Sequence, residues 1–146
     1  MKAITLYQPY ASAIAHGLKH FETRSWQTSY RGPLAIHAAK IQPGWCRSFE
    51  SVEAARGRLS VKMIHGAVVC IADLVDVQPT TEVSRIVSDT ERLYGDFAPG
   101  RWAWKLHHVR VLVEPVFVRG KQGLWSWPVD LKTLRLKKGP RCAPKY

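Results

Sequence analysis

Cysteine and long apolar runs are both scarce in this 146-residue chain. Cys46, Cys70 and Cys142 are an odd number without a C-x-x-C pair, which excludes a disulfide framework and a zinc ribbon and favours reduced thiols. No apolar run approaches the roughly 18 residues of a membrane-spanning helix, and no charged-then-apolar leader opens the chain. We therefore expect a soluble, cytoplasmic protein that does not enter a membrane.

Metal-ligand patterns are also poorly represented. His16 and His20 have the i,i+4 spacing of two ligands on one helix face. Gly17 lies between them at a predicted helix end and breaks the shared face. We expect neither a metal site nor a cofactor.

Acidic residues are few, and their distribution is uneven. The chain has 11 Asp and Glu against 22 Lys and Arg, with a net charge of +11. Residues 1–49 carry six basic residues against one acid, residues 50–100 five against eight, and residues 101–146 eleven against two. Positive charge gathered at both ends favours a polyanionic partner, of which RNA is the first candidate and DNA the second. The alternative explanation is that some of these charged residues serve to keep the protein in solution.

Hydrophobic periodicity predicts a chain rich in strands with a few inserted helices. The predicted strands are residues 3–7, 19–24, 34–40, 64–77 and 102–106 continued by 109–118, and the predicted helices are 9–16, 43–58 and 80–94. Strands and helices do not alternate regularly, which favours an α+β or small-barrel architecture over a doubly wound sheet. The length suits one domain, residues 1–130, followed by a basic, flexible tail at 131–146.

One short passage, Gly17-Leu18-Lys19-His20-Phe21-Glu22-Thr23-Arg24, carries more chemistry than packing requires. It resembles the G-x-K-x-x-E-x-R signature of the ASCH domain family, small β-barrels related to PUA RNA-binding domains. Residues 8–11 resemble that family's Q-P-[WY]-A entry, and residues 102–104 its late aromatic strand. The resemblance implies a PUA-like barrel with two to three flanking helices.

The same resemblance implies two functions. ASCH family members are described as RNA- or DNA-binding modules, and some small relatives as ribonucleases or as hydrolases of N4-acetylcytidine. In the acetylcytidine-hydrolysing relatives a threonine stands three residues after the motif lysine, where this chain has Glu22. A carboxylate cannot form the same acyl intermediate, although it can act as a general base on water. We therefore expect binding first, with a hydrolase that uses Lys19 and Glu22 as the alternative.

Within the motif, Glu22 and Arg24 lie at i and i+2 of a predicted strand and so point to the same face. We expect them to form an ion pair, which leaves Lys19 available for a ligand. On this interpretation Lys19→Ala changes the free energy of unfolding by no more than about 0.5 kcal/mol. The alternative is a surface ion-pair cluster that ties the first helix to the barrel.

Other candidate ligand-binding residues lie close to the motif. His37 stands between two alanines in the predicted strand 34–40, either facing a ligand or packed and hydrogen-bonded inside the barrel. Trp26 and Tyr30 lie in a loop beside basic residues and are candidates for stacking on bases. We predict that a monomer binds single-stranded RNA, or a modified nucleoside within it, in one cleft. The predicted cleft residues are Gln8, Lys19, Glu22, Arg24, Trp26, Tyr30, Arg31, His37, Lys40, Asp96 and Arg101.

The charge distribution generates a prediction for salt dependence. Affinity for a generic single strand falls steeply between about 50 and 200 mM salt, because binding to phosphates releases condensed counterions. Titrations of a labelled strand at several salt concentrations measure this slope. A flat response contradicts the polyanion interpretation.

Overall fold

The computed structural model describes residues 1–59 and 63–139. Over these residues the chain forms seven strands in one mixed sheet, four short α-helices and one 3-10 helix. The strands are β1 (Lys2–Leu6), β2 (Phe21–Arg24), β3 (Gly32–Ala38), β4 (Ala67–Pro79), β5 (Trp102–Phe117), β6 (Leu124–Ser126) and β7 (Leu136–Lys138). The helices are α1 (Tyr10–Ala15), α2 (Gly44–Ala55), α3 (Thr80–Val83), α4 (Asp89–Leu93) and the 3-10 helix η1 (Leu131–Thr133). The fold is α+β, as predicted.

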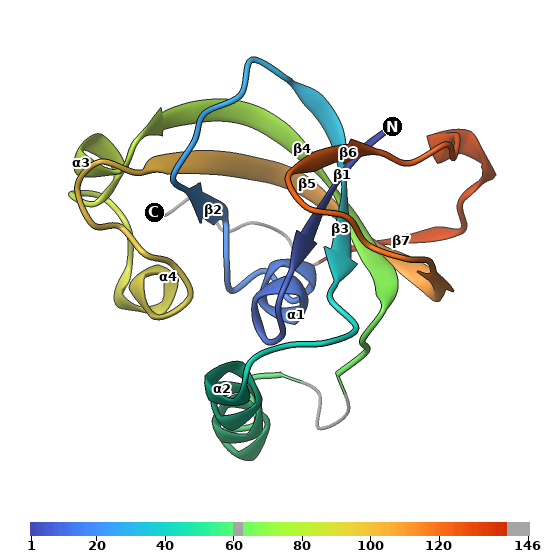
Figure 1. The fold of residues 1–146 in the computed structure, drawn as a ribbon, viewed down its shortest axis with the longest axis horizontal. Coiled ribbons are helices and arrows are strands. Elements are labelled where there is room, and N and C mark those ends of the chain that lie inside the picture. Colours follow the sequence, from blue (N-terminus) through green and yellow to red (C-terminus); the bar gives the residue numbers. More distant parts are fainter. Residues whose placement is uncertain (60–62, 140–146) are drawn as a thin grey trace.

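The sheet curls into a half-barrel (Figure 1). Its strand order is β2-β5-β4-β3-β1-β6, with β7 paired to β5 beside that path. β1 and β3 run parallel, and the other pairs are antiparallel. The two longest strands, β4 and β5, shift register three times, and His108 adopts a φ of 46° in β5. Such bulges bend strands, and here β5 continues through the break expected near residues 107 and 108.

Alternation along the strands separates two apolar clusters. Ile4 and Leu34 face the inside of the curve, where Ile14 of α1 packs against them. Ala3 and Ala35 face the other side, where Trp125, Trp127 and several aliphatic side chains cover them. The buried helix α1 therefore occupies the concave side of the sheet beside β1 (Figure 1).

The single helix predicted over residues 80–94 is wrong, because two short helices, α3 and α4, occupy this segment. The second begins at Ser88, whose hydroxyl accepts a hydrogen bond from the backbone N–H of Glu91 at 3.2 Å. A serine three residues before a glutamate is a helix-start signal, and it interrupts the longer helix here. The segment therefore turns and brings α4 against the start of β2.

The prediction of a flexible tail from residue 131 is wrong for residues 131–139. η1 and β7 follow β6, and β7 pairs with β5 through Leu136 opposite Leu112. Residues 140–146, including Cys142, lie outside the described residues. Cys46 and Cys70 are free and buried. No helix in the described ranges is long and apolar enough to cross a membrane.

The packing of β7 can be tested with two neighbouring residues. Leu136 packs against the cluster that contains Trp125, whereas Lys137 is exposed. We expect Leu136→Ser to lower the free energy of unfolding by about 1.5 kcal/mol through lost apolar burial, and Lys137→Ser to change it by less than about 0.5 kcal/mol. Urea unfolding of both variants measures the difference. Equal midpoints contradict the docking of this segment.

Candidate functional site: a charged cleft across the half-barrel

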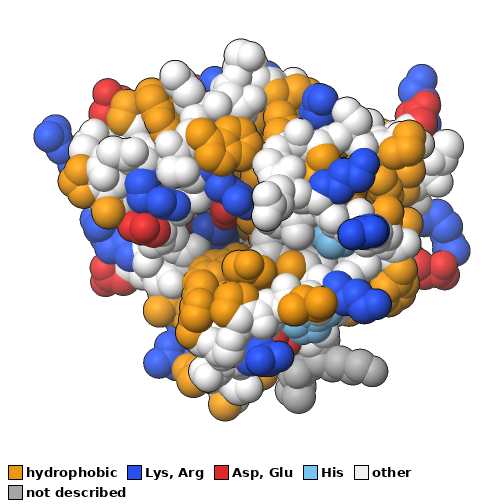
Figure 2. Space-filling model, in the orientation of Figure 1, with side chains coloured by type: hydrophobic (Ala, Val, Ile, Leu, Met, Phe, Trp, Pro, Cys, Tyr) orange, Lys and Arg blue, Asp and Glu red, His pale blue; other side chains and the backbone are white. Residues whose placement is uncertain are grey.

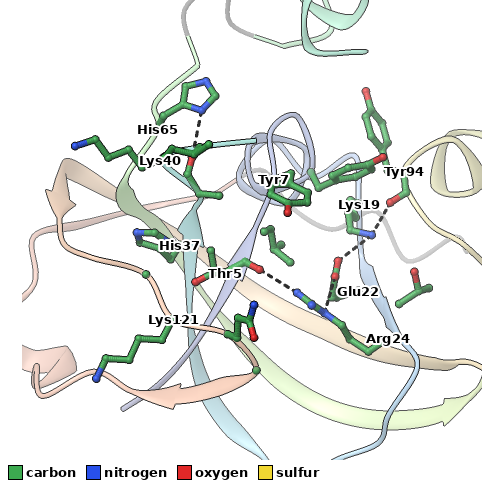
Figure 3. A pocket seen from close by; sticks show the side chains of 18 of the residues that line it. Thr5, Tyr7, Lys19, Glu22, Arg24, His37, Lys40, His65, Tyr94 and Lys121 are labelled. Carbon is green, nitrogen blue, oxygen red and sulfur yellow. Dashed lines mark hydrogen bonds and ion pairs between the residues drawn. The ribbon is translucent and has the colours of Figure 1, made fainter. Parts of the chain in front are cut away.

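A cleft of about 1430 Å³ extends from the concave side of the sheet to the edge where β1, β3 and β5 end. Its lining comes from residues 5–7, 10, 19, 22–26, 37, 39–41, 45, 65–66, 93–96, 101 and 117–123. Figure 2 shows lysine and arginine side chains and a hydrophobic patch around a central hollow on this face. In Figure 3, Lys19, Glu22 and Arg24 lie on one side of the cleft and His37 and Lys121 on the other. Segments far apart in the sequence thus share one cavity.

The Lys19 side chain is buried, although sequence analysis predicted it to be free for a ligand. The side chain is 1% exposed, and its ammonium group donates to the carbonyl oxygens of Phe21 at 2.7 Å and Tyr94 at 2.6 Å. It also pairs with Glu22 Oε2 at 3.2 Å. An ammonium group has three N–H donors, so protein acceptors account for all three. The expectation of an available lysine is therefore wrong.

The expected ion pair between Glu22 and Arg24 is present. Arg24 Nε lies 3.1 Å from Glu22 Oε1, and Arg24 Nη2 donates to the carbonyl oxygen of Thr5 at 3.0 Å. Thr5 belongs to β1, which β5, β4 and β3 separate from β2 in the sheet. The chain of contacts from Lys19 through Glu22 and Arg24 to Thr5 therefore spans the concave face (Figure 3). We call these four residues the cross-barrel ion chain.

A second buried carboxylate supports the far end of this chain. The carbonyl of Tyr94 holds Lys19, and the hydroxyl of Tyr94 donates to Glu53, which is fully buried. Arg56 and Arg58 approach the same carboxylate at 3.1 and 3.0 Å. Burial by itself raises the pKa of Glu53, but the hydrogen bonds from Tyr94 and Arg58 and the charges of Arg58 and Arg56 together outweigh it and lower that pKa. Burial and the adjacent carboxylate raise the pKa of the Tyr94 hydroxyl.

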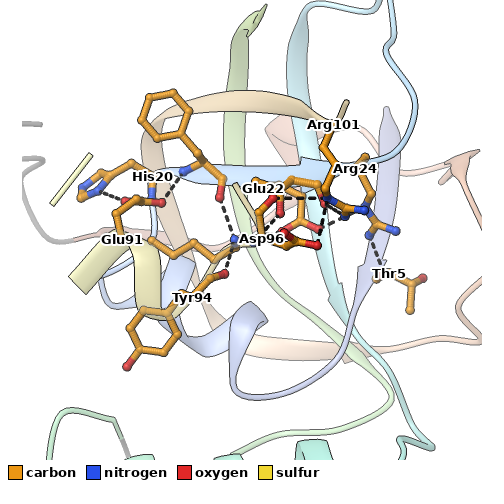
Figure 4. A network of polar contacts seen from close by, with 11 residues as sticks. Thr5, His20, Glu22, Arg24, Glu91, Tyr94, Asp96 and Arg101 are labelled. Carbon is orange, nitrogen blue, oxygen red and sulfur yellow. Dashed lines mark hydrogen bonds and ion pairs between the residues drawn. The ribbon is translucent and has the colours of Figure 1, made fainter. Parts of the chain in front are cut away.

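Glu91 fixes the start of β2. Its carboxylate accepts from the backbone N–H groups of His20 and Phe21, each at 2.9 Å, and lies 3.0 Å from His20 Nδ1 (Figure 4). Only 3% of Glu91 is exposed. These hydrogen bonds compensate the buried carboxylate for its lost hydration. They also hold α4 against the start of β2.

Asp96 and Arg101, both predicted site residues, form a pair at the edge of the cleft. Arg101 Nε lies 3.3 Å from Asp96 Oδ2, and Arg101 Nη2 donates to the carbonyl oxygen of Thr23 at 3.4 Å. The backbone N–H of Asp96 donates to Thr23 Oγ1 at 3.0 Å. These contacts connect β2 to the loop before β5.

His37 lies in the floor of the cleft. It is 1% exposed, its Nε2 donates to the Val118 carbonyl oxygen at 2.9 Å, and its ring contacts Trp125 edge-on. Burial lowers the pKa of His37, against the opposing effect of the Val118 hydrogen bond, so the ring is neutral at pH 7. A Cβ at position 120 would lie 2.6 Å from His37 Nδ1 and 2.8 Å from Thr5 Oγ1, so Gly120 is in direct contact with the floor. The alternative of a packed, hydrogen-bonded His37 is confirmed, although the residue also lines the cleft.

The cleft brings together eight of the eleven predicted residues. Those that line it are Lys19, Glu22, Arg24, Trp26, His37, Lys40, Asp96 and Arg101. Trp26 packs edge-on against Trp104 with ring centroids 4.7 Å apart, so part of its surface serves the core.

Gln8, Tyr30 and Arg31 do not line the cleft. Gln8 is fully buried, accepts from the Ser12 N–H at 3.0 Å and donates to the Ile64 carbonyl at 2.8 Å, so it holds the start of α1. Tyr30 donates its hydroxyl to the Pro33 carbonyl at 2.5 Å. Arg31 donates to carbonyls of its own loop. Hydrogen bonds within the protein therefore hold the side chains of these three residues away from the cleft.

Sequence analysis missed five exposed aromatic and basic residues of the cleft, namely Tyr7, Trp45, Phe117, Arg119 and Lys121. Tyr7 and Phe117 lie at strand ends, and Arg119 and Lys121 follow the last residue of β5. The available signal was an aromatic or basic residue where a strand stops. Its significance depends on which strand ends share one edge of the sheet, which local sequence does not reveal.

Among the described residues, no group of three His, Cys, Asp or Glu side chains is arranged to hold a metal ion. The available chemistry is that of buried ion pairs, exposed cations and exposed aromatic rings. The architecture and cavity together define a small half-barrel domain with a charged cleft on its concave side.

The chain belongs to the ASCH domain family, whose model matches residues 4–116. A crystal structure of ASCH from Zymomonas mobilis is similar in fold, with a TM-score of 0.50 and 18% sequence identity, covering 80% of this chain and 73% of that one. A point mutant of that protein gives a TM-score of 0.49 at 18% identity, covering 80% of this chain and 75% of the mutant. No curated protein matches this chain in sequence. At 18% sequence identity, this likeness supports a shared fold and nothing beyond the fold.

The burial of Lys19 generates a stability prediction opposite to that from sequence. Lys19→Met leaves the Tyr94 and Phe21 carbonyls without their donor and removes one partner of Glu22, so we expect the free energy of unfolding to fall by about 3 kcal/mol. Lys40→Met, an exposed lysine of the same cleft, serves as the control and should change it by less than about 0.5 kcal/mol. Chemical denaturation measures both variants. If Lys19→Met unfolds at the wild-type midpoint, these three interactions of the ammonium group contribute nothing.

Proposed function

We propose that this protein binds single-stranded RNA, or a modified nucleotide within such a strand, in the charged cleft. The proposal depends on one observation: exposed aromatic rings and exposed cations that have no partner among the described residues gather in the same cavity. Cations bind the phosphates of a nucleic acid, and aromatic rings stack on its bases. Membership of the ASCH domain family supports a nucleic acid as the partner in general terms.

The cations of the cleft fall into two groups. Lys19, Arg24 and Arg101 are held by the protein's own acceptors. The side chains of Lys40, Arg119 and Lys121 are exposed, and the described part of the chain offers them no hydrogen-bond or ion-pair partner. We call these last three residues the rim cations. They are free to meet phosphates, whereas the first group keeps its charge inside the wall.

The acids of the cleft do not oppose this role. Glu22 and Asp96 are the two carboxylates that line it, and each is paired with an arginine. The rim cations therefore face the opening without a neutralising carboxylate from the lining. An anion that enters meets net positive charge, which raises the rate of association and supplies salt-dependent affinity.

The alternative function is hydrolysis of N4-acetylcytidine or of RNA, with Lys19 and Glu22 as catalytic groups. General base catalysis requires a carboxylate within reach of a water proton, and nucleophilic catalysis requires a free amine. Lys19 already has three acceptors, and Glu22 is shared between Lys19 and Arg24. The geometry favours binding over these reactions.

The proposal predicts that the rim cations carry the affinity. We expect the triple variant Lys40→Ala, Arg119→Ala, Lys121→Ala to lose about tenfold or more in affinity for a labelled single-stranded RNA of mixed sequence at low salt. We also expect the slope of log affinity against log salt to fall by about 2, at roughly 0.7 for each phosphate of the single strand that is no longer neutralised. Fluorescence anisotropy measures both quantities.

A matched triple variant removes three exposed cations that do not line the cleft, Arg85, Lys132 and Lys137. It removes the same charge, so its retained affinity shows that position matters. If both triple variants lose affinity equally, binding is not located in the cleft. If the wild-type protein does not bind RNA at low salt, the proposed function is wrong.

A further inference from the structure

Exposed aromatic side chains are concentrated in the cleft to an unusual degree. Among the described residues, the aromatic side chains that are more than about a third exposed are Tyr7 at 42%, Trp45 at 59% and Phe117 at 73%. All three line the cleft. Most other aromatic rings, including Trp104 and Trp125, are at least partly buried within the apolar clusters. Contact between an aromatic ring and water is unfavourable. The presence of three exposed rings at one site therefore indicates that a binding partner covers them.

Backbone hydrogen bonds place these aromatic residues along one edge of the sheet. The Ala39 N–H donates to Leu6 O at 2.8 Å, the Gly66 N–H donates to Ala38 O at 2.8 Å, and the Val118 N–H donates to Gly66 O at 3.2 Å. The ends of β1, β3 and β5 therefore lie in a row with the start of β4. Tyr7 stands at one end of this row and Phe117 at the other.

The dimensions of the row suit more than one nucleotide. Four neighbouring strands are separated by three spacings of roughly 4.8 Å, so the row is about 14 Å wide. Lys40 follows β3 near the middle, and its aliphatic stem faces Gly66. Arg119 and Lys121 follow Phe117 in the chain, on either side of Gly120, which lies against His37 and Thr5. Aromatic rings thus flank a cation along a single edge.

Two aromatic rings, those of Tyr7 and Trp45, lie together at the β1 end of the row. Tyr7 and Trp45 meet edge to face, with centroids 6.4 Å apart and planes at 87°. Trp45 lies in the first turn of α2. Contact with Tyr7 supports the indole while most of its surface remains exposed, which leaves a flat apolar face beside the cleft. The exposed side chain of Ile41, between β3 and α2, adds apolar surface to the same lining.

We propose that this edge is a stacking platform for two bases of one RNA strand: Trp45, supported by Tyr7, receives one base, Phe117 receives another, and Lys40 receives the intervening phosphate. The inference rests on the proposed function and adds how the strand is held. Phe117, Arg119 and Lys121 lie beyond the residues that the family model matches. The cations beside the rings favour a nucleic acid over an apolar protein segment, because a phosphate follows each base along a strand.

The test uses two probes of the same length, a labelled ten-nucleotide single-stranded RNA and a strand whose central bases are replaced by abasic sites. We expect Trp45→Ala and Phe117→Ala each to weaken binding of the RNA by about 5- to 150-fold, the range for loss of one stacked base. Affinity for the abasic strand should stay within about twofold, because its phosphates remain. Trp45→Phe, which keeps a flat ring, should restore most of the RNA affinity.

Ile86→Ala is the matched control, since Ile86 is 53% exposed and does not line the cleft. It should bind both probes like the wild type, and circular dichroism should show that every variant is folded. If Trp45→Ala and Phe117→Ala keep wild-type RNA affinity while removal of the rim cations abolishes it, the platform is wrong and the proposed function survives. If both variants lose RNA and the abasic strand equally, stacking is also wrong. If wild-type protein binds neither probe, both proposals fail together.

Discussion

The buried ammonium group of Lys19 is the constraint on which the cleft depends. A charge removed from water is tolerated only where its partners replace the lost hydration, and here two carbonyl oxygens and a carboxylate do so. These acceptors come from three places: the start of β2, its interior and the turn after α4. Arg24 extends the network to β1. The cross-barrel ion chain therefore fixes the opening of a sheet that does not close on itself.

This arrangement separates charges that maintain the cavity from charges that face its contents. The ion chain and the Asp96–Arg101 pair satisfy one another within the wall, so they set its shape and polarity. The rim cations lack such partners in the described residues and follow the ends of β3 and β5. The exposed rings lie at the ends of β1 and β5 and in the first turn of α2. The signature motif thus shapes the cleft, and residues outside the motif supply the surfaces available to a ligand.

The sequence predicts what depends on neighbouring residues. The α+β class and most strands follow from periodicity, and the Glu22–Arg24 pair follows from i,i+2 spacing in a strand. The burial of Lys19 depends on Tyr94, 75 residues away, and so has no local signal. The same limit applies to Tyr7 and Phe117, which share an edge only because β1 and β5 end on the same side of the sheet. The break before α4 was readable in the Ser88-to-Glu91 pattern, but the longer apolar periodicity concealed it.

The close approach of Gly120 to the cleft floor affects how the cavity accommodates molecules of different shape. At this point backbone lies directly on His37 and Thr5, with no side chain between them. A side chain can rotate away from an incoming group, but the backbone at this point cannot move further toward the buried ring. The cavity therefore has one unyielding boundary and, at Lys40, Arg119 and Lys121, flexible ones. A molecule that enters the cavity therefore has to fit against the first boundary, whereas the side chains of the second can adjust around it.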